Sequence, residues 1–186
     1  MDVSLTEKGR AEARDAAERL RDLELHALHC STLGRARQTL HELRECLQLH
    51  HLPTREHEAL NERDYGELTG KNKWQVRDAW GEEKFHLLRR SWDHPVPGGE
   101  TLKDVHTRVV PYFEEQIRPQ LCADKNVLVC FHGNSMRALV KHLDQIPDDR
   151  IASLEIATGE LYLYRFDAEG KIVSKEIRAA DYGQRI

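Results

Sequence analysis

The sequence has no long hydrophobic run. Its longest uninterrupted apolar stretch is Val127-Leu-Val-Cys-Phe131, whereas a membrane-spanning helix needs about 20 apolar residues. The first residues, Met1-Asp-Val-Ser-Leu-Thr-Glu7, are acidic and lack the apolar core of a secretory signal peptide. We therefore expect no membrane partner and a cytoplasmic location.

Paired cysteines and an excess of basic residues are also missing. The four cysteines, Cys30, Cys46, Cys122 and Cys130, form no Cys-x-x-Cys motif, so neither a zinc site nor a disulfide framework is indicated, and a reducing compartment is expected. Lysine and arginine total 28 against 32 aspartates and glutamates, which gives a net charge of −4. Proteins that bind nucleic acid are usually basic, so we expect no nucleic-acid partner.

The chain is long enough for one domain with a substantial core. Its 186 residues are close to the usual ~150 residues of a single domain, and a chain of this length buries about 70% of its unfolded surface. No repeat, low-complexity tract or flexible linker divides it. We therefore expect residues 1–186 to form a single domain.

The apolar residues predict helices that alternate with strands. From Leu33 to Leu47 they recur every three or four positions, as on one face of an amphipathic helix. Helices are predicted over 6–22, 33–47, 72–80, 82–90, 101–117 and 134–143, and strands over 25–30, 127–131, 161–166 and 171–176, with a short strand after Pro53. This alternation predicts an α/β fold, a three-layer α/β/α sandwich. Only residues 127–131 read as a fully buried central strand, so the predicted sheet is incomplete.

The segment from Val127 to Leu139 has the pattern of a strand, a turn and a helix. The buried strand is followed by His132, Gly133 allows a turn, and a helix begins near Asn134. Ligands of open α/β sheets bind at the carboxyl ends of strands, and the first turn of a helix attracts anions. A histidine there can contact a phosphoryl group or move a proton. The alternative is a histidine that only caps the helix.

Several cations stand at breaks between the predicted elements. Arg35 lies in the first turn of a helix, where the helix dipole disfavours a positive charge unless an anion is near. Arg89 and Arg90 are adjacent near a helix end, and Lys73 follows the Gly70 turn. Arginine grips phosphate through two N–H groups, whereas lysine acts as a point charge. For any one of these residues alone, simple surface solvation is the better interpretation.

A polar loop, Leu60-Asn-Glu-Arg-Asp-Tyr-Gly66, offers a candidate proton-transfer group. Glu62 is flanked by polar and aromatic residues, and a carboxylate that is partly shielded from water can act as a general acid or base. A loop salt bridge between Glu62 and Arg63 is an equally good interpretation of this segment on its own.

Taken together, these segments resemble a known family. The motifs that carry the resemblance are Asp2-Val-Ser-Leu-Thr-Glu-Lys-Gly9, Ser31-Thr-Leu-Gly-Arg-Ala36, Leu60-Asn-Glu-Arg-Asp-Tyr-Gly66, Leu68-Thr-Gly-Lys-Asn-Lys73, Arg89-Arg-Ser91, Gly99-Glu-Thr-Leu102, His132-Gly-Asn-Ser-Met-Arg-Ala-Leu-Val140 and Ala157-Thr-Gly159. They occur in the order found in the cofactor-dependent phosphoglycerate mutases of the histidine phosphatase superfamily. The resemblance covers nearly all of the chain.

The resemblance implies an activity and a set of site residues. It implies interconversion of 3-phosphoglycerate and 2-phosphoglycerate in glycolysis and gluconeogenesis, primed by 2,3-bisphosphoglycerate and without a metal. Glu62 is then the proton donor and acceptor, and His132 stabilises the transferring phosphoryl group. The residues that the resemblance assigns to substrate and phosphate binding are Arg35, Arg63, Tyr65, Lys73, Arg89, Arg90, Gly133 and Asn134. Fixed cations of this kind stabilise phosphoryl transfer electrostatically. Relatives are often dimers or tetramers, so the resemblance is compatible with a homo-oligomer, but the sequence does not determine the oligomeric state.

The sequence departs from the family pattern in two notable ways. Asp64 stands where many relatives carry a histidine. The family also opens with a central strand that ends in Arg-His-Gly, whose histidine carries the phosphoryl group, and no Arg-His-Gly occurs here. We expect an N-terminally truncated mutase in which the edge of strand 127–131 is left unpaired. Such a chain is expected to be inactive alone and poorly stable, because covalent catalysis needs its nucleophile.

Two other functions fit the same residues. A phosphatase of the superfamily would release free phosphate, whereas a mutase would not. A non-catalytic protein would bind phosphorylated metabolites through the remaining cations without turnover. Arg89, Arg90, Lys73 and the 60–66 loop favour the mutase.

Overall fold

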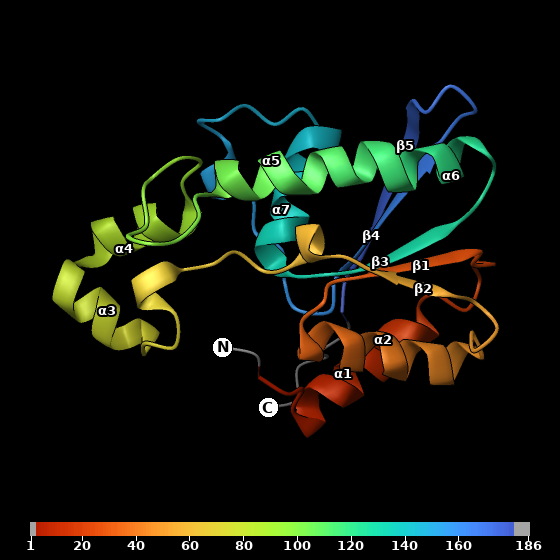
Figure 1. The fold of residues 1–186 in the computed structure, drawn as a ribbon, viewed down its shortest axis with the longest axis horizontal. Coiled ribbons are helices and arrows are strands. Elements are labelled where there is room, and N and C mark those ends of the chain that lie inside the picture. The colour runs from red at the N-terminus through yellow and green to blue at the C-terminus, as the bar shows by residue number, and fades with distance from the viewer. Residues whose placement is uncertain (1–2, 181–186) are drawn as a thin grey trace.

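The computed structural model describes residues 3–180, apart from the side chain of Lys73, and it contains a parallel sheet between two layers of helices (Figure 1). The strands are β1 (Ala27–Cys30), β2 (Thr54–Glu56) and β3 (Val127–Cys130), in the order β2-β1-β3. Leu28 of β1 lies opposite Thr54 on one side and Leu128 on the other. Because all three strands are parallel, their carboxyl ends meet at one edge of the sheet.

Two helices cover each face of the sheet. Helices α1 (Glu7–Glu18) and α2 (Gly34–Leu47) pack on one face, and α5 (Leu102–Tyr112) and α7 (Gly133–Leu143) pack on the other (Figure 1). Alternate residues of β3 enter the two cores: Leu128 and Cys130 face α1 and α2, whereas Val127 and Val129 face α5 and α7. The predicted α/β/α sandwich is therefore confirmed.

The central strand is β1 rather than β3, contrary to the sequence prediction. β1 is paired on both edges and is almost fully buried, and a buried histidine, His29, interrupts its apolar run. In β3 only Cys130 is fully buried. Within residues 3–180, the second edge of β3 pairs with no strand, because β4 (Leu161–Phe166) and β5 (Ile172–Arg178) form a separate antiparallel sheet. Within these residues β3 is therefore an edge strand, which explains why it is only half-buried.

The predicted helix over 101–117 is divided. A capping box of Thr101 and Asp104 starts α5. A π-helical turn (Phe113–Ile117) and α6 (Arg118–Cys122) follow α5. Pro111 and Pro119 lack the N–H that would continue the regular bonding pattern. Single turns of 3-10 helix lie at Glu58–Leu60, Gly66–Leu68 and Ile151–Ser153.

In the described part of the chain, no helix has the length and apolarity needed to cross a bilayer.

Helices α3 (Lys73–Trp80) and α4 (Glu82–Arg90) extend away from the sheet, at the left of Figure 1. We call residues 66–99 the α3–α4 segment. It has a small core of its own, built from Leu68, Val76, Leu88 and Val96. Two stretches of backbone connect it to the rest of the molecule, residues 63–66 and residues 97–100, and we call them the neck.

The two stretches of the neck are hydrogen-bonded to each other. Glu100 N donates to Asp64 O at 2.8 Å, and Glu67, the residue that follows the first stretch, donates from its N to Pro97 O at 3.1 Å. Gly66 has a φ of +52°, and a Cβ atom there would lie 2.2 Å from Pro97 O. Only glycine fits both the left-handed conformation and this close approach.

Candidate active site

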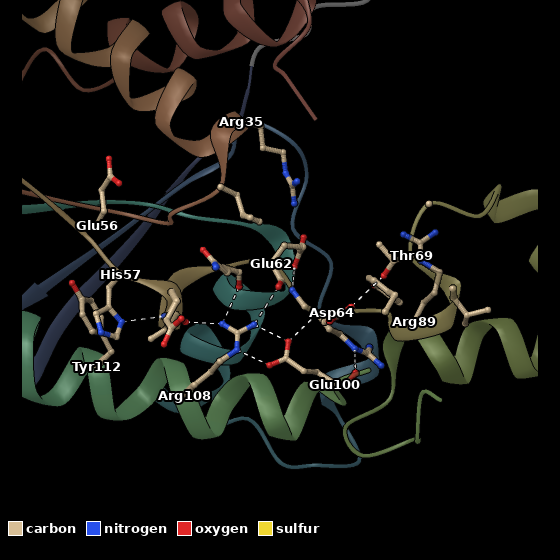
Figure 2. Close-up of a pocket in the computed structure, with 18 of the residues that line it drawn as sticks. Arg35, Glu56, His57, Glu62, Asp64, Thr69, Arg89, Glu100, Arg108 and Tyr112 are labelled. Atoms are coloured by element: carbon tan, nitrogen blue, oxygen red, sulfur yellow. Dashed lines mark hydrogen bonds and ion pairs between the residues drawn. The ribbon is translucent and has the colours of Figure 1, made fainter. Parts of the chain in front are cut away.

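A cavity of about 1330 Å³ lies where the sheet, α5 and the α3–α4 segment meet. Its lining includes the predicted site residues Arg35, Glu62, Arg63, Tyr65 and Arg89. Figure 2 shows Arg35, Glu62 and Arg89 entering from three separate parts of the chain. The cavity therefore combines fixed cations with a carboxylate, as a site for a small anion requires.

Glu62 is held against the first turn of α7. Its Oε1 accepts a hydrogen bond from Arg63 N at 2.9 Å and a second from Asn134 N at 3.2 Å. The backbone of Glu62 is also fixed, because Arg108 donates to its carbonyl oxygen at 3.2 Å. The carboxylate thus has a defined position against Asn134, which lies two residues after His132 in the chain.

His132 is the N-cap residue of α7 and is 8% exposed. Arg35 Nε donates to its Nδ1 at 3.2 Å, and Ser31 Oγ lies 2.8 Å from its Nε2. Ser31 Oγ in turn donates to Asn61 Oδ1 at 2.7 Å. Because the serine has only one proton to give, Nε2 of His132 carries the proton shared with Ser31, and Nδ1 is the acceptor for Arg35. This network assigns the tautomer of His132.

The N-terminus of α7 brings together the other predicted residues of this motif. Gly133 is the exposed first residue of the helix. Asn134 Nδ2 donates to Tyr65 Oη at 3.2 Å, so the helix contacts the loop that carries Glu62. Backbone N–H groups at a helix N-terminus, with the positive end of its dipole, favour an anion beside them.

Arg63 is less accessible than a substrate contact would be. It is 3% exposed, its Nε donates to Glu100 O, and its guanidinium lies 5.0 Å from the centre of the Tyr65 ring. Within the described residues, Nη1 and Nη2 are buried and have no hydrogen-bond partner. Burial lowers the pKa of this guanidinium, and the neighbouring Tyr65 and Glu100 oppose that effect. Arg63 therefore belongs to the wall of the cavity, with its guanidinium packed against Tyr65.

The remaining predicted cations are not all turned to the cavity. Arg89 lines it, with its guanidinium 5.5 Å from the centre of the Phe85 ring. Arg90 Nη2 instead donates to Glu155 Oε1 at 2.8 Å. Lys73 is the first residue of α3, and its side chain lies outside the described residues.

Arg137 was missed by sequence reasoning although it connects three predicted residues. It is 3% exposed. Its guanidinium donates to the carbonyl oxygens of Arg89 and Arg90, at 3.4 and 2.9 Å, and to Asn134 Oδ1 at 3.2 Å. Burial is the main cause that lowers its pKa to about 10, so it remains charged at neutral pH. An arginine in a helix carries no local signal of such contacts, because its partners are distant in sequence.

Asp64 has a local structural explanation. Its Oδ1 accepts hydrogen bonds from Gly66 N at 2.8 Å and from Thr69 Oγ1 at 3.2 Å. This is an Asx turn, which an aspartate forms readily. Asp64 therefore shapes the start of the α3–α4 segment.

Over residues 3–180, no three histidine, cysteine, aspartate or glutamate side chains are grouped so as to hold a metal ion.

The fold and the site define a class of protein. In this site a parallel strand leads to His132 at the N-terminus of a helix, Arg35 donates to that histidine, and Glu62 accepts from the first turn of the helix. The sequence profile of the histidine phosphatase superfamily (branch 1) matches residues 1–177. The chain belongs to this superfamily.

Within the superfamily, the chain is similar to phosphoglycerate mutases. It is 44% identical over 178 residues to the 2,3-bisphosphoglycerate-dependent phosphoglycerate mutase of Parvibaculum lavamentivorans, covering 95% of this chain and 85% of the relative. It is 44% identical over 181 residues to the protein of the same name from Brucella canis, covering 96% and 88%. These relatives are enzymes, and the expected enzyme family is confirmed.

Solved structures share the fold. Bacillus stearothermophilus YhfR has a TM-score of 0.79 and 26% identity, covering 92% of this chain and 82% of that one. A mycobacterial glucosyl-3-phosphoglycerate phosphatase has a TM-score of 0.71 and 25% identity, covering 83% and 74%. The fold is thus found in a solved structure that is named as a phosphatase.

Proposed function

We propose that this chain carries the site for interconversion of 3-phosphoglycerate and 2-phosphoglycerate, and that residues 1–186 form one domain. The observation that carries the proposal is the contact between Glu62 and the start of α7. Glu62 Oε1 accepts a hydrogen bond from Asn134 N in the first turn of α7. His132, the N-cap residue of the same helix, accepts a hydrogen bond from Arg35. The mutase relatives at 44% identity support the same substrates.

The cations and the helix N-terminus bind the phosphoglycerate. Arg35 and Arg89 approach the cavity from opposite sides (Figure 2), and the first turn of α7 adds backbone N–H groups and the positive end of a dipole. Because these charges are already in position, little free energy is spent on reorienting them as the phosphoryl group moves. They therefore stabilise the transition state. His132, already bonded to Arg35, adds a ring N–H to the same anion when it is released from Ser31.

Glu62 exchanges the proton of the substrate hydroxyl. The two backbone N–H groups that orient its carboxylate both donate to Oε1. Oε2 is then the oxygen that meets a hydroxyl proton in the cavity. A general base needs such a fixed position within hydrogen-bond reach of the reacting group.

We propose the same cavity as the site for 2,3-bisphosphoglycerate, on which the mutase relatives depend by name. That molecule carries two phosphates and a carboxylate, and Arg35 and Arg89 with the N-terminus of α7 are the groups that would hold it. When bound, it would supply a phosphoryl group to the histidine of the family's Arg-His-Gly motif, which these 186 residues do not contain.

The 186 residues contain no Arg-His-Gly, so these residues by themselves bind phosphoglycerates without transferring the phosphoryl group. Calorimetry with 3-phosphoglycerate, together with a coupled mutase assay primed by 2,3-bisphosphoglycerate, tests this. Saturable binding without formation of 2-phosphoglycerate is the expected result. Turnover by the 186-residue chain would contradict the proposed inactivity, and absence of binding would contradict the proposed site.

A phosphatase is the second candidate, favoured by the structural similarity to the glucosyl-3-phosphoglycerate phosphatase. Free phosphate distinguishes the two functions. Release of phosphate from 3-phosphoglycerate in the same samples would favour hydrolysis over the mutase reaction.

A further inference from the structure

Arg108, on α5, uses its whole guanidinium to fix the turn before the neck. Nη1 donates to Ala59 O at 2.7 Å and to Asn61 O at 2.9 Å, and Nη2 donates to Glu62 O at 3.2 Å. Nε and Nη2 also donate to the two carboxylate oxygens of Glu100, at 2.7 and 2.9 Å. All five N–H groups of an arginine are thereby paired. The carbonyl oxygen of Glu62 is one of their acceptors.

Glu100 connects this arginine to the other stretch of the neck. Its Oε2 accepts a hydrogen bond from Asp64 N at 2.9 Å, and its backbone N donates to Asp64 O at 2.8 Å. Its backbone oxygen accepts from Arg63 Nε. Figure 2 shows Glu100 between Arg108 and the chain at Asp64. One carboxylate thus contacts both the helix layer and the residues that lead into the α3–α4 segment.

We propose that Glu100 and Arg108 are positioning residues. They hold the backbone of Glu62 in place and fix the position of the α3–α4 segment relative to Glu62. This inference rests on the proposed function, because it takes Glu62 as the proton-transfer group. The pair is well suited to the task. Its side chains are 26% and 24% exposed, and partly buried, bidentate pairs of this kind are stronger than exposed ones.

The coupling matters because the cavity has two walls. Glu62 belongs to the main body, whereas Arg89 belongs to the α3–α4 segment. A phosphoglycerate that contacts both needs them at a fixed separation, and the neck is the covalent connection between them. Loosening the neck should therefore weaken ligand binding without unfolding either core.

The test compares Glu100→Gln and Arg108→Lys with Glu42→Gln. Glu42 is a matched control, since its carboxylate also accepts from two groups, Arg10 and Arg14, both at 2.8 Å, but on α1 and α2. Hydrogen–deuterium exchange of residues 59–66 and 97–101 reports on the neck. Trp74 and Trp80 lie on α3 and are exposed, whereas Trp92 packs against the main core and Lys141 of α7. Acrylamide quenching of tryptophan fluorescence therefore reports, through Trp92, on how the α3–α4 segment rests on the main body. Calorimetry gives the affinity for 3-phosphoglycerate.

We expect both neck variants to exchange faster, to be quenched more and to bind about tenfold more weakly, because each loses charged hydrogen bonds. Glu42→Gln should change none of the three. Arg108→Lys keeps the charge but loses the fork of donors, so unchanged behaviour in that variant would overturn the positioning role. So would a Glu100→Gln variant that matches Glu42→Gln. If Glu100→Gln fails to fold, Arg108→Lys gives the same comparison. If the unaltered chain binds no 3-phosphoglycerate, the proposed function fails. The exchange data then still decide whether Glu100 and Arg108 fix the position of the α3–α4 segment.

Discussion

His29 is a polar side chain in the most buried strand of the sheet. Its Nδ1 lies 2.7 Å from Tyr112 Oη, and its Nε2 lies 2.9 Å from Gln120 Nε2. Because the glutamine nitrogen is a donor, Nε2 is the acceptor and Nδ1 carries the proton. Burial is the largest cause that lowers the pKa of His29 to about 4. The histidine is therefore neutral at pH 7 and serves the packing of β1 against α5 and α6.

This pKa makes the stability of the protein depend on pH. Below about pH 6.5 the unfolded chain binds a proton at His29, whereas the folded chain does not until about pH 4. Stability is therefore lost as the pH falls from 6.5 towards 4. Between pH 7 and pH 5, this histidine should lower the free energy of unfolding by about 2 kcal/mol.

Urea unfolding at pH 7 and pH 5 checks the effect in the unaltered chain and in His29→Gln. The variant should lose less stability between the two pH values, whatever its stability at pH 7. Substitution of the exposed His51 by glutamine is the control. Equal pH dependence in all three proteins would show that His29 does not cause the loss.

The α3–α4 segment depends on glycine for its attachment. Gly66 has a positive φ and no room for a Cβ, while Gly81, between α3 and α4, has a positive φ of +84° but open space around it. The two positions therefore separate the cost of the backbone conformation from the cost of the close contact. Gly99 is equally crowded, since a Cβ there would lie 2.6 Å from Gly66 N.

Gly66→Ala should open the hydrogen-bonded neck and so loosen the attachment of the α3–α4 segment to the main body. We expect it to destabilise the neck by about 2 kcal/mol or more, because it adds a steric clash to the backbone strain, and Gly81→Ala should cost less. Limited proteolysis within residues 66–99 and the quenching of tryptophan fluorescence measure this opening. Similar protection in the two variants would mean that the close contact at Gly66 contributes little.

The molecule has two parts that share one cavity. The two cores on the faces of the sheet belong to the main body, and the cluster around Val76 and Leu88 belongs to the α3–α4 segment. A ligand bound between Arg35 and Arg89 contacts both parts. Binding to the folded state alone stabilises it by mass action.

Addition of 3-phosphoglycerate should therefore raise the melting temperature of the whole chain. At a concentration of about 100 times Kd, the stabilisation should be roughly 2.7 kcal/mol. Differential scanning fluorimetry checks the shift, with glycerate, which lacks the phosphate, as the control ligand. The shift should also shrink in high salt, because the attraction is electrostatic. An equal shift with glycerate would contradict a site built for phosphate.

Sequence reasoning succeeded where the signal was local. The amphipathic spacing of residues 33–47 became α2, the turn at Asp167 and Gly170 became a hairpin, and the strand, His132 and the helix after it appear in order. It failed where burial depends on distant neighbours. The central position of β1 was hidden by His29, and the burial of the Arg63 guanidinium against Tyr65 depends on a packing contact that the sequence does not specify. Arg90 pairs with Glu155, which is far away in the chain.

The order of apolar and polar residues was sufficient to predict most of the helices and the α/β class, because these depend on periodicity. The family was predicted separately, from the resemblance of short motifs. Which strand is central, how Glu62 meets the start of α7 and how Glu100 and Arg108 hold the neck depend on contacts between residues that are far apart in the chain. Such contacts arise only when the layers pack, since hydrogen bonds of buried charges have partners that no local pattern specifies.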